Sequence, residues 1–197
     1  MLNAKTVGVL GILPRIGTTT QALQLTRYLL QQQRFAAYIE MNSSNYVYKS
    51  LELYSTAKED VQTSSGMITF MDIEMYTKDN LISAQKKSYD YLIKDYGNVT
   101  DLEYQKISFL EQDIKIVVCG SKPNEIFNIE DPFLKDKDYA DVFFIFNLTP
   151  QEDRKYLLDV MGKKSDRTFF AGVQPDPFSS IVPNPIYGDI LNKSTRG

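Results

Sequence analysis

The sequence predicts an α/β fold, in which a doubly wound, mostly parallel sheet is flanked by helices. The first observation is that short apolar runs recur along the 197 residues, and several are continuous, as in strands that are buried on both faces. The second is that helical segments separate these runs and can supply the crossover connections that parallel strands need. A chain of this length suits one hydrophobic core, so we expect a single domain over residues 1–197.

Six strands are predicted from the apolar runs. They are Val7–Gly11, Ala36–Glu40, Tyr91–Lys94, Ile114–Cys119, Val142–Asn147 and Thr168–Val173. A further stretch, Thr69–Tyr76, alternates less cleanly, because Phe70 and Met71 break the period of two. We interpret it as an extra edge strand or one arm of a hairpin.

Helices are predicted between the strands. Thr18–Gln33 gathers leucines and a tyrosine on one broad side, so it should pack beside the first strand. Asp101–Leu110 and Pro150–Gly162 have helical character, and acidic residues in the first turn of the second suit the helix dipole. Gly162 is its stop signal. After an ordered meander rich in proline and asparagine, a short helix is expected around Tyr187–Leu191.

The composition indicates a folded protein and excludes several kinds of chemistry. Hydrophobic residues make up 43% and charged residues 24% of the chain, close to ordinary globular values. There is no histidine, which removes the usual near-neutral general base and the commonest metal ligand, and so excludes a Ser-His-Asp triad and zinc chemistry. Cys119 is the one cysteine, so no internal disulfide forms, and its apolar surroundings in the sequence predict a buried thiol rather than a nucleophile.

Charge and hydropathy limit the partners. The net charge is −3 and no dense basic run occurs, so a nucleic-acid partner is not expected. No apolar run approaches the roughly 18 residues of a membrane span, and the N-terminal segment is too short and too soon interrupted for a signal peptide. We therefore expect a cytoplasmic protein without a membrane span.

A glycine-bearing loop follows the first predicted strand. The segment VGVLGILPRIGTTT, from Val7 to Thr20, reads as a buried strand, a loop and the opening of a helix. This layout lets backbone N–H groups surround a phosphate, at the positive end of the helix dipole. Thr18, Thr19 and Thr20 would lend those N–H groups, and Thr19 falls where a hydroxyl would ligate magnesium. The alternative is a run of threonines that only caps the helix.

The loop lacks the lysine of a P-loop. That motif has Gly, four residues and then Gly-Lys-Ser/Thr, whereas here Gly17 is followed by Thr18, and five residues separate Gly17 from Gly11. A charge-assisted hydrogen bond contributes about 1.5 to 3 kcal/mol, so its loss weakens binding by roughly ten- to a hundredfold unless another group substitutes. Arg15 lies inside the loop, and its guanidinium offers a bidentate fork to phosphate. The alternative is that Arg15 points into water.

Polar residues end two further predicted strands. Asp95 ends an apolar strand, where it could hold magnesium through water or orient an attacking water; the alternative is a solvated carboxylate. Glu40 and Asn42 also fall at a strand end and would help to place magnesium or a water, or else serve as turn residues. Doubly wound folds bind ligands at the carboxyl ends of their strands, which favours Asp95 as a site residue.

Longer segments resemble the ParA/MinD family of deviant-Walker ATPases, in the SIMIBI class of P-loop proteins. GTTTQALQLTRYLLQQQRFAAYIEMN is similar to the family's opening, which runs from Gly-Lys-Thr-Thr through a helix to a strand ending in an acidic pair. In that match Gly17, Thr19 and Thr20 are retained, Thr18 takes the place of the lysine, and Glu40-Met41-Asn42 stands where the acidic pair would be. YDYLIKDYGN resembles the strand that carries the Walker B aspartate, here Asp95, and leads to the second switch at Gly97.

Two more segments extend the resemblance over nearly the whole chain. FIFNLTP resembles the strand whose terminal asparagine, here Asn147, touches the adenine base in that family; otherwise Asn147 merely starts the next helix. Gln174–Phe178 resembles the loop that closes over the base, which makes Pro175 and Asp176 cofactor-binding candidates. A rigid structural turn is the competing account of this segment.

The resemblance implies a nucleotide switch similar to ParA, MinD or the TadZ group. Such a protein would bind ATP and Mg²⁺, form a homodimer and recruit protein partners. Leu13 stands where the family's signature lysine would be, and Pro14 and Arg15 replace its paired glycines, so hydrolysis is expected to be slow or absent. Two alternatives stay open: a pseudo-ATPase scaffold without nucleotide, and a phosphoryl- or acyl-transfer enzyme on the same fold, similar to small biotin-pathway ligases. The missing lysines and histidines disfavour the enzyme.

Overall fold

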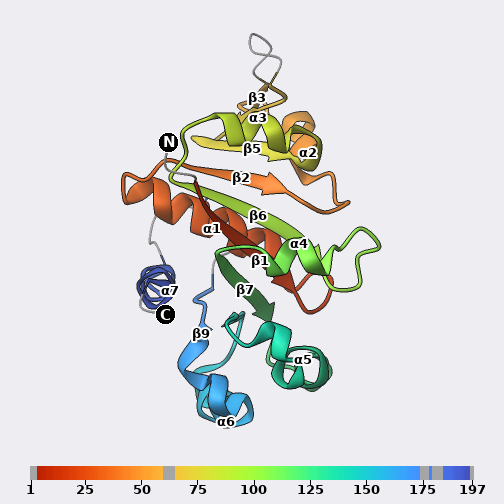
Figure 1. The fold of residues 1–197 in the computed structure, drawn as a ribbon, viewed down its shortest axis with the longest axis vertical. Helices are drawn as coiled ribbons and strands as arrows, with labels where there is room; N and C mark the ends of the chain where they lie inside the picture. The colour runs from red at the N-terminus through yellow and green to blue at the C-terminus, as the bar shows by residue number, and fades with distance from the viewer. Residues whose placement is uncertain (1–3, 60–64, 174–177, 179–183, 196–197) are drawn as a thin grey trace.

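The computed structural model describes residues 4–59, 65–173, 178 and 184–195. Within these residues, nine strands form one sheet through the middle of the molecule (Figure 1). In sheet order they are β3 (Lys58–Glu59), β4 (Ile68–Phe70), β5 (Ile73–Thr77), β2 (Ala36–Glu40), β6 (Tyr91–Asn98), β1 (Lys5–Gly11), β7 (Ile114–Cys119), β8 (Phe143–Phe146) and β9 (Thr168–Phe170).

The sheet is parallel from β5 through β9 and antiparallel where β4 joins β5 and β3 joins β4. The central strand β1 lies between β6 and β7, and later strands are added on both sides of it, so the chain winds outward in two directions. The predicted fold class, a doubly wound and mostly parallel α/β sheet, is confirmed.

The stretch that broke the period of two is a hairpin. β4 pairs with β5 so that Phe70 lies opposite Ile73, which leaves Met71 and Asp72 as a two-residue turn. Both turn residues have positive φ, at 49° and 64°, the backbone of a type I′ turn whose twist matches that of the strands it joins. β5 also pairs in parallel with β2, so it is an interior strand, and the hairpin interpretation is the correct one.

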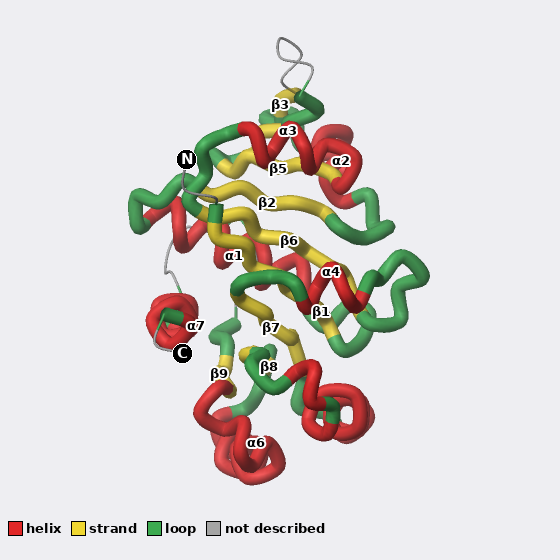
Figure 2. Tube along the Cα trace, in the orientation of Figure 1, coloured by secondary structure: helices red, strands yellow, loops and turns green. Residues whose placement is uncertain are grey.

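Helices cover both faces of the sheet (Figure 2). One core cluster joins the sheet to α1 (Thr18–Gln31), α2 (Tyr46–Leu53) and α7 (Ile186–Ser194). Two others join the opposite face to α3 (Leu81–Lys86), α4 (Lys106–Leu110), α5 (Pro123–Ile129) and α6 (Arg154–Met161). The shorter helical segments are the 3₁₀ turns Lys78–Asn80, Lys137–Tyr139, Gln151–Asp153 and Gly162–Arg167 and the π-helical Glu130–Lys135.

Alternation along each strand fills both layers. In β7, Ile116 and Val118 belong to the cluster under α1, whereas Val117 and Cys119 belong to the cluster under α5 and α6. β7 is therefore buried on both faces, as its sequence, apolar except at Lys115, predicts. Cys119 is fully buried, as expected, and burial raises the pKa of its thiol well above the ordinary value, which keeps it protonated.

Two predicted helices differ from the observed ones at their starts. α4 begins at Lys106 rather than Asp101, because the Asp101 carboxylate accepts the N–H of Glu103 at 3.0 Å and holds this stretch in a turn. α6 begins at Arg154 after a 3₁₀ turn and stops at Gly162, whose φ of 53° confirms it as the stop signal.

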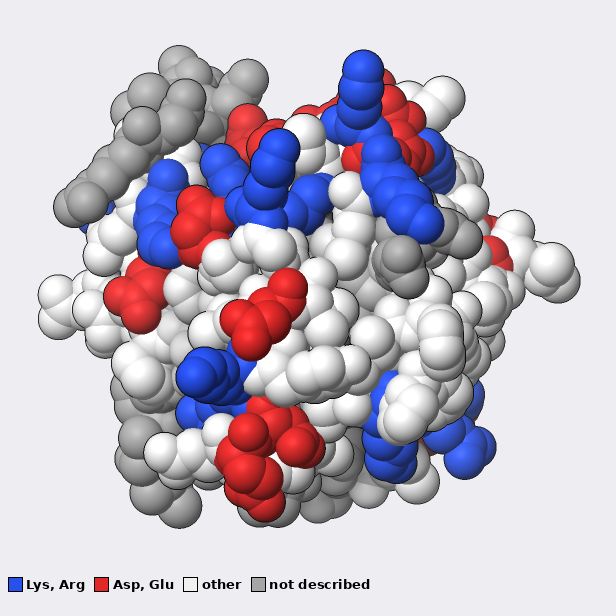
Figure 3. Space-filling model, turned by 90° about the horizontal axis from the view of Figure 1, so that it is seen from below, with Lys and Arg blue, Asp and Glu red and all other residues white. Residues whose placement is uncertain are grey.

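Two observations concern the possible surroundings of the molecule. None of the helices in the described ranges combines the length and apolar character needed to cross a membrane. On the face drawn in Figure 3, lysine and arginine side chains are interspersed with aspartate and glutamate. This face therefore has no extended field of a single sign, which agrees with the low basic charge of the sequence.

Candidate functional site

The connection between β1 and α1, residues 12–17, is here called the β1–α1 loop. It ends at Gly17, which has φ 96° and ψ 23° and provides no side-chain cap to α1. The N–H of Gln21 is bonded to the carbonyl oxygen of Gly17 at 2.9 Å, so the regular α-helical pattern starts with Gln21. The N–H groups of Thr18, Thr19 and Thr20 precede that bond and have no acceptor within the helix. The helix therefore begins with amide donors directed out of its end.

A cavity of about 350 Å³ lies in front of these donors. Three segments line it: residues 13–15 and 17–20 of the loop and helix, residues 42 and 44 after β2, and residues 97, 98 and 101 at and after the end of β6. The strands that lead into these segments, β1, β2 and β6, are neighbours in the sheet. The cavity therefore lies at their carboxyl ends, where α/β folds bind ligands. Its volume is within the range of about 300 to 1,000 Å³ that is typical of ligand sites.

The loop packs closely enough to require two glycines. A Cβ atom on Gly11 would lie 2.2 Å from Oγ1 of Thr18, because this threonine folds back against the end of β1. A Cβ atom on Gly17 would lie 2.3 Å from Nδ2 of Asn147, at a backbone φ that side chains with a Cβ rarely adopt. The short loop is thus built around the absence of both side chains.

Asp95 lies at the base of the site, fully buried within β6. Its carboxylate accepts the hydroxyl of Thr19 at 2.6 Å, the hydroxyl of Tyr38 at 2.8 Å and the N–H of Gly97 at 2.9 Å. Burial raises the pKa of Asp95 above its usual value, and the three hydrogen bonds oppose this shift. The pKa of Tyr38 is raised well above normal, by burial first and by the charge of Asp95 second, so this phenol stays protonated and donates.

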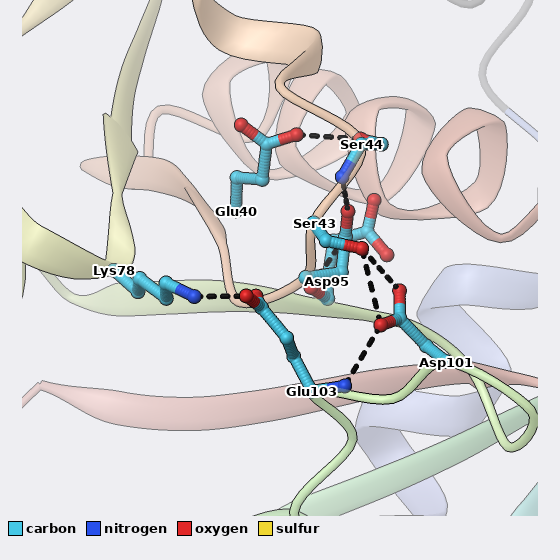
Figure 4. Close-up of polar contacts among 8 residues, drawn as sticks. Glu40, Ser43, Ser44, Lys78, Asp95, Asp101 and Glu103 are labelled. Atoms are coloured by element: carbon cyan, nitrogen blue, oxygen red, sulfur yellow. Dashed lines mark hydrogen bonds and ion pairs between the residues drawn. The ribbon is translucent and has the colours of Figure 1, made fainter.

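The two predicted residues at and after the end of β2 have different partners, and Figure 4 shows the contact of Glu40 with Ser44. Glu40 accepts the hydroxyl of Ser44 at 2.5 Å and the N–H groups of Tyr46 and Val47 at 2.5 and 3.3 Å, so its carboxylate caps the start of α2. Asn42 donates from Nδ2 to the carbonyl oxygen of Asp95 at 3.0 Å and lines the cavity. The structure therefore brings Asn42 to the site and turns Glu40 toward the adjacent helix.

Asn147, directly after β8, contacts the loop from its other side. Its Nδ2 donates to the carbonyl oxygen of Ile16 at 2.9 Å, and its Oδ1 accepts from Nε2 of Gln21 at 2.7 Å. A smaller hollow of about 120 Å³ adjoins it and is bordered by Arg15, Thr20 and Gly172, among others. The remaining predicted cofactor residues, Pro175 and Asp176, lie outside the described residues.

Arg15 supplies the positive charge at the cavity. It is exposed, has a φ of 61°, and is the one lysine or arginine among the described residues that line the cavity. None of the ion pairs between described residues involves it. On the opposite wall Asp101 accepts the Ser43 hydroxyl at 3.1 Å, which ties the segment after β6 to the segment after β2 (Figure 4).

Tyr38, Ser43 and Asp101 are among the participants that were not predicted from the sequence. Tyr38 carries a hydroxyl among the apolar residues of β2 that precede Glu40, and a buried hydroxyl needs a partner. That requirement is a usable signal, although the partner, Asp95, lies on another strand. The Ser43–Asp101 contact joins two loops that are far apart in sequence, and no local sequence pattern predicts it.

Comparison with solved structures shows which proteins share this fold. A plasmid partition protein from Borrelia burgdorferi bound to AMPPNP superimposes with a TM-score of 0.60 at 16% identity, covering 98% of this chain and 99% of the other. The MinC:MinD cell division complex of Aquifex aeolicus gives a TM-score of 0.61 at 13% identity, covering 98% and 95%. A ParA family ATPase from Chlorobium tepidum gives 0.61 at 12% identity, covering 98% and 99%. No protein-family model and no curated protein matches the sequence.

The parallel sheet, with a glycine-bearing loop between β1 and α1, has the fold of P-loop NTPases, which the solved structures above share. More particularly, the chain has the ParA/MinD-like form of that fold over nearly its whole length.

Proposed function

We propose that this protein binds ATP with Mg²⁺ and acts as a nucleotide-dependent switch of the partitioning or localisation type, with slow or absent hydrolysis. The observation that carries the proposal is the open anion cradle. The first-turn amides of α1 face a cavity of about 350 Å³ at the carboxyl edge of the sheet. Amide donors and the helix dipole both favour a phosphate there.

The residues present fit a nucleotide phosphate and magnesium. Thr19 and Asp95 provide a hydroxyl and a carboxylate oxygen within 2.6 Å of each other, and oxygen atoms are the ligands that magnesium prefers. Among the described residues no group of three acidic or sulfur side chains is arranged to hold a metal by itself. Magnesium would therefore be held mainly by phosphate oxygens and water, with Thr19 as a ligand and Asp95 acting through water.

The weak or absent turnover follows from the charge of the site. Thr18, which stands where the resemblance places the Walker A lysine, is folded against Gly11 and offers a neutral hydroxyl. Phosphoryl transfer depends on positive charge at the transferring group, and Arg15 is the one cation that the described lining supplies. Arg15 can bind phosphate in a bidentate manner, so it sustains binding better than it sustains catalysis.

The switch would work through the two loops that line the far wall. Asn42 and Gly97 both border the cavity, and the hydrogen bond between Ser43 and Asp101 couples the segments in which they lie. A ligand that contacts both segments shifts the population of their conformations and so changes the surface that a partner meets. We propose that a homodimer and a recruited protein partner read this change; a protein partner is bound in the MinC:MinD complex, which has this fold.

The second candidate is a scaffold that binds no nucleotide. One observation favours it: Thr19 and Asp95, the residues that would serve magnesium, are hydrogen-bonded to each other at 2.6 Å, so each has a partner within the chain. A scaffold would present a protein-binding face whose use does not depend on ATP. Substitutions Arg15→Ala and Asp95→Ala would then leave partner capture intact.

Isothermal titration calorimetry and thermal shift with Mg-ATP, Mg-ADP and Mg²⁺ alone test the proposal. We expect a dissociation constant for Mg-ATP in the range of about 1 μM to 1 mM, with a matching rise in melting temperature. A protein that shows neither heat nor a thermal shift at millimolar Mg-ATP is the scaffold instead. Released product that Asp95→Ala abolishes would reveal an active enzyme and contradict the predicted lack of turnover.

A further inference from the structure

A chain of hydrogen bonds links helix α7 to the β1–α1 loop. The hydroxyl of Tyr187 in α7 donates to Oε1 of Gln21 in α1 at 2.7 Å. Nε2 of Gln21 donates to Oδ1 of Asn147 at 2.7 Å, and Nδ2 of Asn147 donates to the carbonyl oxygen of Ile16 at 2.9 Å. Tyr187 and Gln21 are 1% and 2% exposed, so solvent water does not replace the bond between them.

The carbonyl group of Ile16 fixes which atoms donate and which accept along this chain of hydrogen bonds. The carbonyl oxygen of Ile16 only accepts, so Asn147 must turn its NH₂ group toward the loop and its oxygen toward Gln21. Gln21 in turn must direct its NH₂ group to Asn147 and its oxygen to Tyr187. Burial raises the pKa of Tyr187, which keeps the hydroxyl proton that the chain requires. Removing that hydroxyl leaves a buried amide oxygen without its donor.

The chain acts on a part of the loop that needs support. Ile16 lies between Arg15 and Gly17, whose φ values are 61° and 96°, and a non-glycine residue with positive φ is strained. Asn147 is itself fixed, because its N–H is bonded to the carbonyl oxygen of Cys119 at 2.9 Å. The bond from Asn147 to Ile16 therefore anchors the strained corner of the loop to the end of β8.

We infer that Tyr187 and Gln21 are positioning residues, which hold the β1–α1 loop through Asn147 so that the amides of Thr18 to Thr20 converge on the cavity. This inference rests on the proposed function for its ligand. Tyr187 is not among the described residues that line the cavity, so it acts on the site without touching it. Its ring packs on that of Tyr28 with centroids 5.8 Å apart, so the docking of α7 on α1 sets how firmly the anion cradle is held.

The test compares Tyr187→Phe with Tyr28→Phe by amide hydrogen exchange over residues 12–21 and by calorimetry with Mg-ATP. Both variants remove one tyrosine hydroxyl from the same pair of packed rings, but only Tyr187 belongs to the chain of bonds. One hydrogen bond corresponds to about a three- to tenfold effect. We expect Tyr187→Phe to speed exchange of the loop and first-turn amides, and to raise the dissociation constant of Mg-ATP, by that factor. Tyr28→Phe should change both by less than about twofold.

A double variant separates positioning from a purely structural role. Adding Gln21→Met to Tyr187→Phe removes the orphaned buried oxygen, so part of the lost melting temperature should be recovered. Gln21→Met also takes away the donor to Oδ1 of Asn147, so loop exchange should remain fast. The inference is overturned if Tyr187→Phe exchanges like wild type, or if the double variant regains slow exchange. If wild type binds no Mg-ATP, the proposed function fails, and the exchange measurements still decide the positioning role.

Discussion

Replacing Thr18 with lysine should turn a weak anion site into a stronger one. Thr18 is 7% exposed, folds against Gly11, and borders a cavity of about 350 Å³ that contains one cation, Arg15, among its described lining residues. A lysine stem starting at the same place can run along the loop and bring an ammonium group to a phosphate bound in front of the amides. The substitution adds the charge that the loop lacks and leaves its glycines unchanged.

The size of the effect follows from the openness of the site. Two unit charges about 4 Å apart interact with about 4 kcal/mol at an effective dielectric constant near 20. Exposure to water and the ordering of a long side chain reduce this value, and hydrogen bonds to charged groups contribute about 1.5 to 3 kcal/mol net. The dissociation constant of Mg-ATP should therefore fall about ten- to a hundredfold.

Calorimetry with wild type, Thr18→Lys and Thr18→Met measures this. Methionine is an unbranched side chain without charge, so it controls for the loss of the threonine and for the added bulk. The lysine variant should bind more tightly than both, and the advantage should shrink as the salt concentration rises. Equal affinities of the lysine and methionine variants would show that no phosphate lies within reach of this position, and would refute the assignment of the cradle.

Three further predictions concern the same region. Arg15→Ala should weaken Mg-ATP binding about tenfold in calorimetry, whereas Arg34→Ala, an exposed arginine beyond the end of α1, should not; equal effects would mean that Arg15 points into water. Gly17→Ala should lower the free energy of unfolding in urea by about 1 to 3 kcal/mol, because φ is 96° and its Cβ would lie 2.3 Å from Asn147; an unchanged midpoint would contradict the described loop. Asp95→Asn should gain stability relative to wild type as the pH rises above about 4. The pKa of Asp95 is raised in the folded protein, so the unfolded chain loses its proton at a lower pH than the folded chain does. The free energy of unfolding of the wild type therefore falls until the pH passes the folded pKa. Urea unfolding across that pH range checks the sign, and a relative gain by wild type would mean that the folded pKa is lowered.

The sheet and its central helix could be predicted from the sequence because their signals are local. Ile114–Cys119 is apolar at every position except Lys115, and the structure buries all of β7 on two faces. Gly17 marks the start of α1 because the turn requires a left-handed residue without a Cβ. The short helices α2, α3 and α5 were not predicted, since their sequences carry weak periodicity and they form by docking on the sheet.

The sequence predicted where the site lies, at the ends of several strands, but it did not predict the contacts within the site. Asp95 and Thr19 meet because parallel strands bring their carboxyl ends to one edge, which the sequence implies. The partners of Glu40 and Asn147 are set by loops packed from elsewhere in the chain, so the sequence indicates that these residues are polar and near the edge but leaves their contacts undetermined. Glu40 is bonded to the start of α2, a helix that was itself missed.

Within the part of the chain that the structure describes, both edge strands of the sheet are short. β3 is two residues long, and both of them, Lys58 and Glu59, are charged and exposed. The opposite border, β9, has three residues. Edge strands that are short, and at β3 also charged, resist edge-to-edge pairing with another sheet. This protects a protein with a mostly parallel sheet against fibrous aggregation. If two copies assemble, their interface should therefore be formed by loops and helices. The chain should not aggregate at concentrations at which proteins with long exposed edge strands do.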